Sequence, residues 1–116
     1  MTITLYGIPN CDTVKKARAW LQARGIEHTF HDYKKQGVPL PRLETWMHAL
    51  GWEALLNRKG TTWRKLDPVQ QAAVHDAASA CELMVAQASV IKRPVVEHPG
   101  GLLVGFDPDE WGRALG

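Results

Sequence analysis

The sequence predicts an α/β domain in which a β-α-β unit and a β-β-α unit are separated by a helical insertion at about residues 40–88. Two β-rich segments, at residues 2–6 and 26–33, flank a stretch of apolar residues at helical spacing. Towards the C-terminus, two apolar runs flank a Pro-Gly-Gly turn at residues 99–101, which is typical of a β-hairpin. The middle of the chain carries helical patterns and helix-capping signals.

The first unit is predicted as strand, helix and strand. Val14, Ala17 and Leu21 recur at helical spacing and form the apolar face of the helix. Gly25 ends the helix as a glycine in the left-handed conformation. In a strand–helix–strand unit of this length the two strands are parallel. Cys11 therefore lies where a strand leads into a helix, at or next to the helix N-cap.

The insertion is predicted to begin with a loop at residues 34–41 and a helix at residues 43–50, which Gly51 closes. The apolar stripe of this helix is typical of core packing. A short helical turn at residues 52–56 follows, and then a polar, positively charged loop at residues 57–62.

Two further helices are predicted in the insertion. Asp67 followed by Pro68 is the N-cap-then-proline signal, and the helix is expected to continue through residues 69–78. Ser79 with Glu82 three residues later matches a capping box, which predicts the start of a second helix.

The last unit is predicted as strands at residues 95–98 and 102–106, followed by a short helix capped by Asp107, with Glu110 three positions on. A β-α-β unit followed by a β-β-α unit is the thioredoxin-type layout, in which a cysteine after the first strand occupies the catalytic position. Folds of this type place a cis proline immediately before the strand opposite that cysteine. The Arg93–Pro94 bond is therefore expected to be cis.

Composition narrows the possible classes of protein. The 116 residues predict a single domain, and a formal net charge of +2 argues against a dedicated nucleic-acid-binding protein. No run of apolar residues approaches the roughly 18 that a membrane span needs, and the first residues do not resemble a signal peptide. Two distant cysteines do not make a disulfide framework, so we expect a cytoplasmic protein with reduced thiols.

The two cysteines are predicted to differ in reactivity. Backbone N–H groups and the positive end of a helix dipole favour a thiolate at Cys11, and Lys15 and Lys16 add positive charge. The alternative is a half-buried cysteine that only packs. Cys81 is expected in the first turn of its helix, among neighbours that look like packing residues, and is predicted to be inert.

Four motifs resemble the arsenate reductase (ArsC) family, whose members are related to glutaredoxins. They are Asn-Cys-x-Thr-x-Lys-x-Ala at residues 10–17 and Ser-x-Ile-Lys-Arg-Pro-Val-Val at residues 89–96. Residues 55–66 and Gly-Phe-Asp-Pro at residues 105–108 fit the branch of the family called YffB. The similarity covers essentially the whole chain.

The resemblance implies a thioredoxin-like fold with Cys11 as the reactive thiol and Arg93 facing an anion or the thiolate. On this basis Asn10 and Thr13 are expected to orient groups beside the thiol. The other candidate contacts for substrate or for a glutathione carboxylate are Lys15, Arg58 and Pro94.

Three departures from the family pattern shape the functional prediction. Asn57 and Phe106 stand where arsenate reductases of this type carry arginines, so weak arsenate reduction is expected. Val14 stands where a Cys-x-x-Cys motif has its second cysteine, so Cys11 cannot form a local disulfide. An external thiol, glutathione being the natural candidate, must then resolve any adduct of Cys11.

The sequence therefore predicts a cytoplasmic thiol oxidoreductase of the arsenate reductase family, with no bound cofactor or metal and glutathione or another small thiol as co-substrate. Three alternatives stay open. They are a regulator similar to Spx that binds RNA polymerase without turnover, a true arsenate reductase, and a folded relative that has lost activity.

Overall fold

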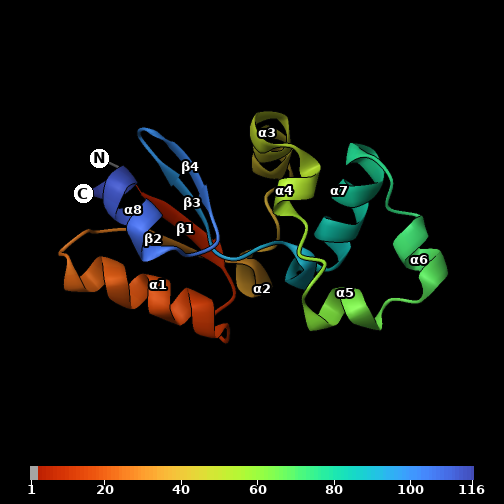
Figure 1. Cartoon of the computed structure of the whole chain (residues 1–116), viewed down its shortest axis with the longest axis horizontal. Helices are drawn as coiled ribbons and strands as arrows, with labels where there is room; N and C mark the ends of the chain where they lie inside the picture. The colour runs from red at the N-terminus through yellow and green to blue at the C-terminus, as the bar shows by residue number, and fades with distance from the viewer. Residues whose placement is uncertain (1–2) are drawn as a thin grey trace. The chain divides into compact units, whose positions relative to one another are not determined.

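The computed structural model describes residues 3–116, and the chain forms two compact units (Figure 1). Unit 1 comprises Met1–Lys35 and Arg93–Gly116, and unit 2 comprises Gln36–Lys92. No helix within residues 3–116 is long and apolar enough to cross a membrane.

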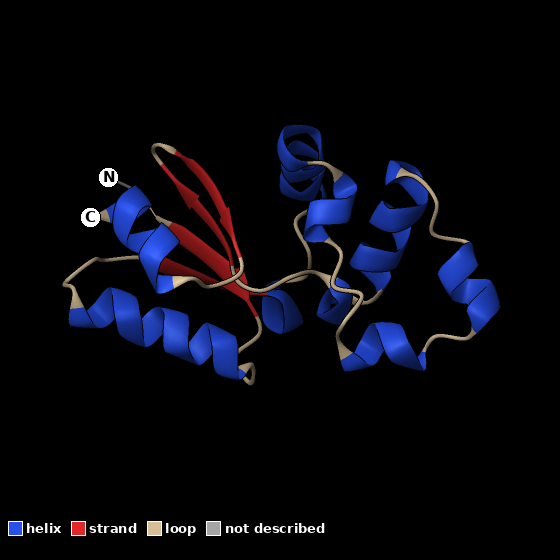
Figure 2. Ribbon diagram, in the orientation of Figure 1, coloured by secondary structure: helices blue, strands red, loops and turns tan. Residues whose placement is uncertain are grey.

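Unit 1 is built on a four-stranded mixed sheet with the strand order β2-β1-β3-β4 (Figure 2). β1 is parallel to β2 and antiparallel to β3, and β3 is antiparallel to β4. The predicted order of β-α-β followed by β-β-α is confirmed, including the hairpin. The bounds of the elements are β1 Thr4–Gly7, α1 Asp12–Ala23, β2 Thr29–Asp32, β3 Val95–His98, β4 Gly101–Val104 and α8 Pro108–Leu115.

The core of unit 1 lies between one face of the sheet and the helices α1 and α8. Leu5 of β1, Leu21 of α1 and Trp111 of α8 are all fully buried in one hydrophobic cluster. Gly7 allows the close approach of β1 to α1, because a Cβ there would lie 2.8 Å from Cγ2 of Val14. The close packing of Gly7 against Val14 therefore fixes how near the first turn of α1 lies to the end of β1.

The second predicted strand, at residues 26–33, is wrong at both ends. β2 covers only Thr29–Asp32, and a helical turn, α2 (Tyr33–Gln36), occupies part of the predicted loop. The physical reason at the C-terminal end is a local hydrogen bond, since the Lys34 N–H donates to Oδ1 of Asp32 at 2.8 Å. An aspartate that bonds two residues ahead starts a turn and ends the strand.

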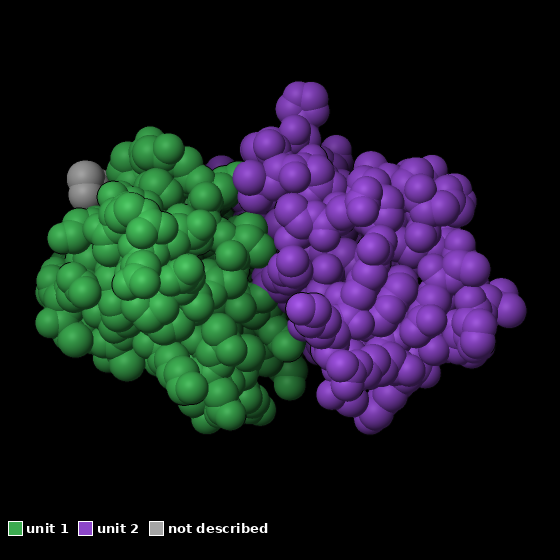
Figure 3. All heavy atoms as spheres, in the orientation of Figure 1, with its two compact units in different colours: residues 1–35, 93–116 green, residues 36–92 purple. Residues whose placement is uncertain are grey.

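Unit 2 is drawn in purple in Figure 3, and the elements between residues 36 and 92 are helices and one isolated β-bridge between Leu56 and Ile91. Its elements are α3 Leu40–Leu50, α4 Trp52–Leu55, α5 Thr61–Lys65, α6 Pro68–Ala72, α7 Ala77–Ala86 and the 3₁₀ helix η1 Ala88–Val90. Leu43 and Trp46 of α3 and Met84 of α7 are fully buried. As predicted, Gly51 ends α3 with a positive φ of 86°.

Three predictions in unit 2 are wrong, and the first two concern α5 and α6. Thr61 and Thr62 were predicted as loop but begin α5. The helix that starts after Asp67 ends at Ala72 instead of continuing to residue 78, although the predicted N-cap is confirmed because Oδ1 of Asp67 accepts from the Gln70 N–H at 2.8 Å.

The capping box of α7 lies three residues earlier than predicted. Asp76 is the N-cap, and its Oδ1 accepts from the Ser79 N–H at 2.9 Å while Oγ of Ser79 accepts from the Asp76 N–H at 3.1 Å. Ser79 is therefore the third helical residue and not the cap, with Glu82 playing no part. Cys81 consequently lies in the second turn of α7 rather than the first.

Candidate active site

Cys11 is the N-cap of α1, as predicted. Its N–H donates to the carbonyl of Ile8 at 3.2 Å, which closes the turn after β1. Its carbonyl accepts from the Lys15 N–H at 3.0 Å, which is the first hydrogen bond of α1. Its side chain is half-buried and caps no backbone group. The thiol therefore lies at the positive end of the helix, where the first backbone N–H groups have no partner within the helix.

The side chains that flank Cys11 are mostly exposed. Asn10 and Thr13 are exposed on either side of it, and Lys15 is exposed one turn further along α1. Asp12 is the acidic residue of the first turn. Their predicted roles in orienting or binding substrate stay predictions.

Arg93 lies at the edge of the sheet from which the Cys11 turn emerges. β3 is antiparallel to β1, with Val95 opposite Tyr6, so the residues just before β3 reach the C-terminal end of β1. The Arg93–Pro94 bond is cis, as predicted. Pro94 is buried and its carbonyl accepts from the Gly105 N–H at 2.8 Å, while Arg93 is half-buried. That Arg93 faces Cys11 stays a prediction.

The Arg93 guanidinium acts electrostatically on Tyr33, the residue that follows β2. Burial raises the pKa of the Tyr33 hydroxyl, and the nearby Tyr6 raises it further, while the positive charge of Arg93 opposes the increase. Tyr33 is 3% exposed. Arg93 thus places a permanent positive charge beside buried groups at this edge of the sheet, where its field is only partly screened.

A groove of about 230 Å³ runs along α1 just beyond the Cys11 turn. It is lined by Pro9, Val14, Lys15, Arg18, Ala19 and Gln22. Motif reasoning missed Arg18, although its place three residues after Lys15 puts both cations on one face of the helix. The groove therefore brings two cations, Lys15 and Arg18, together on the helix that Cys11 caps.

Arg58 belongs to unit 2, where two tryptophans hold it. Its guanidinium lies 5.5 Å from the ring centroid of Trp52 and 5.9 Å from that of Trp63. The loop before α5 is ordered by Asn57, whose Oδ1 accepts from the Lys59 N–H at 3.1 Å. The role of Arg58 as a contact for a glutathione carboxylate stays a prediction.

Cys81 is placed in a setting that disfavours a thiolate. Burial raises the pKa of its thiol, and the carboxylates of Glu44 and Glu82 raise it further. Cys81 also lies in unit 2, whereas Cys11 lies in unit 1. This supports the prediction that Cys81 is the less reactive of the two cysteines.

We expect Cys11 to be alkylated several times faster than Cys81 at neutral pH. Cys11 is half-exposed at a helix N-terminus, whereas the Cys81 thiol is held protonated by burial and neighbouring carboxylates. The measurement is the rate of iodoacetamide labelling of two single-thiol proteins, Cys11→Ser and Cys81→Ser, followed by intact mass. Equal rates in the two proteins would show that the helix terminus does not activate Cys11.

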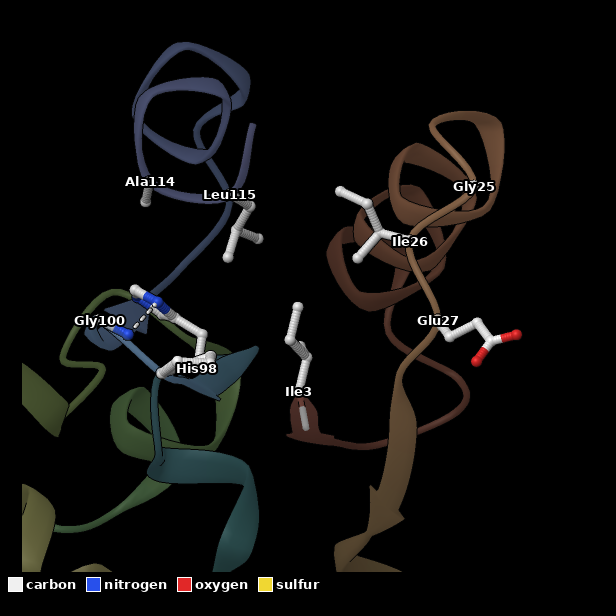
Figure 4. Close-up of a pocket in the computed structure, with 9 residues that line it drawn as sticks. Ile3, Gly25, Ile26, Glu27, His98, Gly100, Ala114 and Leu115 are labelled. Atoms are coloured by element: carbon white, nitrogen blue, oxygen red, sulfur yellow. Dashed lines mark hydrogen bonds between the residues drawn. The ribbon is translucent and has the colours of Figure 1, made fainter. Parts of the chain in front are cut away.

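A cavity within unit 1 lies far from the thiol. It has about 480 Å³ and lies at the sheet edge opposite the Cys11 turn, where Ile3, Ile26 and Leu115 point towards one another (Figure 4). The His98 ring is fixed there because its Nδ1 accepts from the Gly100 N–H at 3.2 Å.

Within residues 3–116 no group of three His, Cys, Asp or Glu side chains is arranged to hold a metal ion.

Comparison with known proteins supplies the wider context. The ArsC family matches residues 6–114. A solved structure described as YffB (PA3664) is 52% identical with a TM-score of 0.92, and the match covers 98% of this chain and 99% of that one. The solved structure of an arsenate reductase (ArsC) related protein from Brucella melitensis is 54% identical with a TM-score of 0.77. That match covers 97% of this chain and 93% of the Brucella protein. The global transcriptional regulator Spx of Listeria innocua is 26% identical over 121 residues, covering 97% of this chain and 86% of Spx.

Proposed function

Because the chain belongs to the ArsC family, we propose that it is a cytoplasmic thiol oxidoreductase that uses Cys11 as its nucleophile and glutathione as the external thiol. The observation that carries the proposal is the position of Cys11, half-exposed at the N-cap of α1 without a second thiol in its turn. Val14, which stands three residues later, is buried against Gly7. The adduct of Cys11 must therefore be resolved by a thiol from outside.

The proposed reaction is the reduction of a mixed disulfide between glutathione and a second thiol. The Cys11 thiolate attacks the glutathione sulfur, the original S–S bond breaks, and the released thiolate takes up a proton from solvent. A reduced glutathione, after loss of its proton, then attacks the glutathione sulfur of the Cys11 adduct. Glutathione disulfide leaves and the Cys11 thiolate is restored, so each turnover consumes one reduced glutathione and converts the mixed disulfide into a free thiol and glutathione disulfide.

Turnover with a glutathionylated peptide and reduced glutathione tests the proposal. Formation of glutathione disulfide is followed by coupling it to NADPH oxidation by glutathione reductase. The proposal expects turnover that depends on both the protein and reduced glutathione. A protein that binds and releases no glutathione under these conditions would be the folded, inactive relative.

Arg93→Gln is expected to lower the rate of mixed-disulfide reduction about 10- to 100-fold, since a hydrogen bond to a charged group is worth about 1.5–3 kcal/mol. In the proposal the guanidinium stabilises the thiolate or the leaving thiolate, and Arg93→Lys restores part of the rate because it keeps the charge without the planar fork. The measurement is the coupled assay, with Arg113→Gln on the exposed end of α8 as the matched control. An unchanged rate in Arg93→Gln would remove the arginine from the mechanism.

Little arsenate reduction is expected, on the order of a hundredfold or more below an ArsC enzyme with all its arginines, since one lost oxyanion donor costs about that factor. Phe106 supports this expectation, because its side chain has no hydrogen-bond donor. Its ring packs edge-on against the rings of Trp111 and Trp20, with centroid distances of 4.9 Å and 6.3 Å. The measurement is arsenite formation with glutathione and glutaredoxin. Turnover that matches the comparison enzyme would mean that another side chain replaces the missing donor.

A second candidate function is a regulator that binds RNA polymerase without turnover. The similarity to Spx favours it, since it extends over 97% of this chain. Val14 weighs against a redox switch of the Cys-x-x-Cys type in that role. Co-purification with RNA polymerase, in a protein that shows no turnover with glutathione, would favour the regulator over the oxidoreductase.

A further inference from the structure

We propose that the groove along α1 binds the carboxylates of a peptide thiol joined to Cys11, with Lys15 and Arg18 as the residues that recognise them. The inference rests on the proposed function and extends it by naming a substrate class and a specificity-determining residue. The substrate class is a short anionic peptide disulfide, of which glutathione disulfide is the simplest example. Arg18 is the residue that the family motifs do not mark.

The spacing of the groove fits a short peptide attached to the thiol. Lys15 follows Cys11 by four residues and Arg18 by seven, so at 1.5 Å per residue they lie about 6 Å and about 10 Å further along α1. An extended chain of three residues spans at most about 11 Å. The two ends of a tripeptide joined to Cys11 through its middle residue can therefore lie up to about 11 Å apart, and the proposal places one carboxylate near Lys15 and the other near Arg18.

The charge of the groove is suited to a dianion. Its lining includes Lys15 and Arg18 and no acidic side chain. The lining also includes the buried Val14 and the exposed Ala19, whose methyl groups can contact the apolar atoms of a peptide. The acid of the first turn, Asp12, is not among the lining residues.

Arg18 is held in place before any ligand arrives. Its guanidinium carbon lies 4.4 Å from the centre of the Phe30 ring, and its Nε donates to Nε2 of His28 at 3.4 Å. Burial lowers the pKa of His28 and outweighs a backbone hydrogen bond at Ile26 that raises it, and the positive charge of Arg18 lowers the pKa further. The neutral imidazole, which this favours, can accept the hydrogen bond from Arg18.

The rest of the Arg18 guanidinium remains available for a ligand. Of its five N–H donors only the Nε–H is used within residues 3–116, so the two terminal amino groups can bind a carboxylate. A side chain fixed on one face by stacking loses less conformational entropy when it binds a ligand. Lys15 is exposed and unconstrained by comparison, so Arg18 is expected to contribute more to recognition.

The test compares two disulfides that differ in charge. The Cys11 thiolate attacks one sulfur of glutathione disulfide or of bis(2-hydroxyethyl) disulfide, forming a mixed disulfide and releasing one thiolate that solvent protonates. Both rates are measured by intact mass in the Cys81→Ser protein, and their ratio reports recognition of the carboxylates separately from thiol reactivity. The variants are Lys15→Gln, Arg18→Gln and the double variant. Arg24→Gln is the matched control, since Arg24 stacks on Trp20 at 4.2 Å at the far end of α1, outside the groove.

The ratio of the glutathione rate to the neutral-disulfide rate is expected to fall about threefold in each single variant and about tenfold in the double variant, as for partly exposed ion pairs. Arg18→Lys should recover part of the loss. In about 1 M salt, where the screening length is about 3 Å, the ratio of the unmutated protein should approach that of the double variant.

Two results would overturn the inference and they are distinguishable. If the double variant keeps the ratio of the unmutated protein while both disulfides still react at Cys11, the groove does not recognise carboxylates but the proposed thiol chemistry stands. If neither disulfide reacts at Cys11 in the unmutated protein, the proposed function fails and the subsite fails with it. Circular dichroism of each variant shows that the helix carrying the groove is intact.

Discussion

Cys11→Ser is expected to reduce mixed-disulfide turnover to the uncatalysed rate while the fold stays intact. A serine hydroxyl is not ionised at neutral pH and cannot form a disulfide, so no adduct can be made. Cys11 makes no side-chain capping bond, and serine is among the preferred N-cap residues. The variant should therefore unfold at the same temperature as the unmutated protein or higher. The measurements are the coupled turnover assay and a thermal melt.

The matched control is Cys81→Ser, which removes the other thiol from the second turn of α7. It is expected to keep most of the turnover, because the Cys81 thiol is disfavoured as a thiolate by burial and by neighbouring carboxylates. A loss equal to that of Cys11→Ser would make Cys81 the resolving thiol, and the external thiol would then have to reduce a Cys11–Cys81 disulfide instead of the Cys11 adduct.

Trp111→Ala is expected to destabilise unit 1 by about 3–5 kcal/mol, the usual cost of truncating a large buried aromatic side chain. Trp111 is fully buried, and its ring packs edge-on against the rings of Phe106 and Trp20, with centroid distances of 4.9 Å and 5.7 Å. Its Nε1–H donates to the Gly105 carbonyl at 3.1 Å. Such a loss is a large part of the roughly 5–15 kcal/mol by which domains are stable. The measurement is urea denaturation followed by circular dichroism.

Trp111→Phe separates the ring from the hydrogen bond. It keeps most of the packing but leaves the Gly105 carbonyl without its donor, so a smaller cost of about 1–3 kcal/mol is expected. If the free energy of unfolding of Trp111→Ala lies within about 1 kcal/mol of that of the unmutated protein, α8 does not stabilise the sheet in the way that the burial of Trp111 indicates.

The parts of unit 1 that the sequence predicts correctly carry strong local signals. The turn before α1 joins a β-rich segment to a helical pattern, and the hairpin has its Pro-Gly-Gly turn, so neither depends on distant residues. The end of β2 was missed because it is set by one side chain, Asp32, that starts a turn where apolar periodicity alone extends the strand.

The errors in unit 2 have a different cause, which is competition between similar signals. Asp76 and Ser79 can form a capping box, and so can Ser79 and Glu82, three residues later in the chain. The structure uses the earlier pair, which lengthens α7 at its start. α5 was missed because Thr61–Lys65 has no apolar stripe and no buried residue from which a helical period can be read.

The candidate site also has a part that local sequence predicts and a part that depends on the folded chain. The position of Cys11 follows from the strand-to-helix turn alone, and the sequence predicts it. The setting of Arg18 depends on Phe30 and His28, which lie beyond the end of the helix and reach Arg18 only when the chain folds back. Phe106 likewise gains its packing role only from Trp20 and Trp111 in the folded chain, whereas its lack of a hydrogen-bond donor is evident from the sequence.

The most direct test of the central claim is the intact mass of the Cys81→Ser protein after incubation with glutathione disulfide and then with reduced glutathione. The account predicts one glutathionyl group, located on Cys11 by peptide mapping, and its complete removal by reduced glutathione with release of glutathione disulfide. The absence of any adduct on Cys11, or an adduct that dithiothreitol removes and reduced glutathione does not, would contradict the proposal that Cys11 works with glutathione as its external thiol.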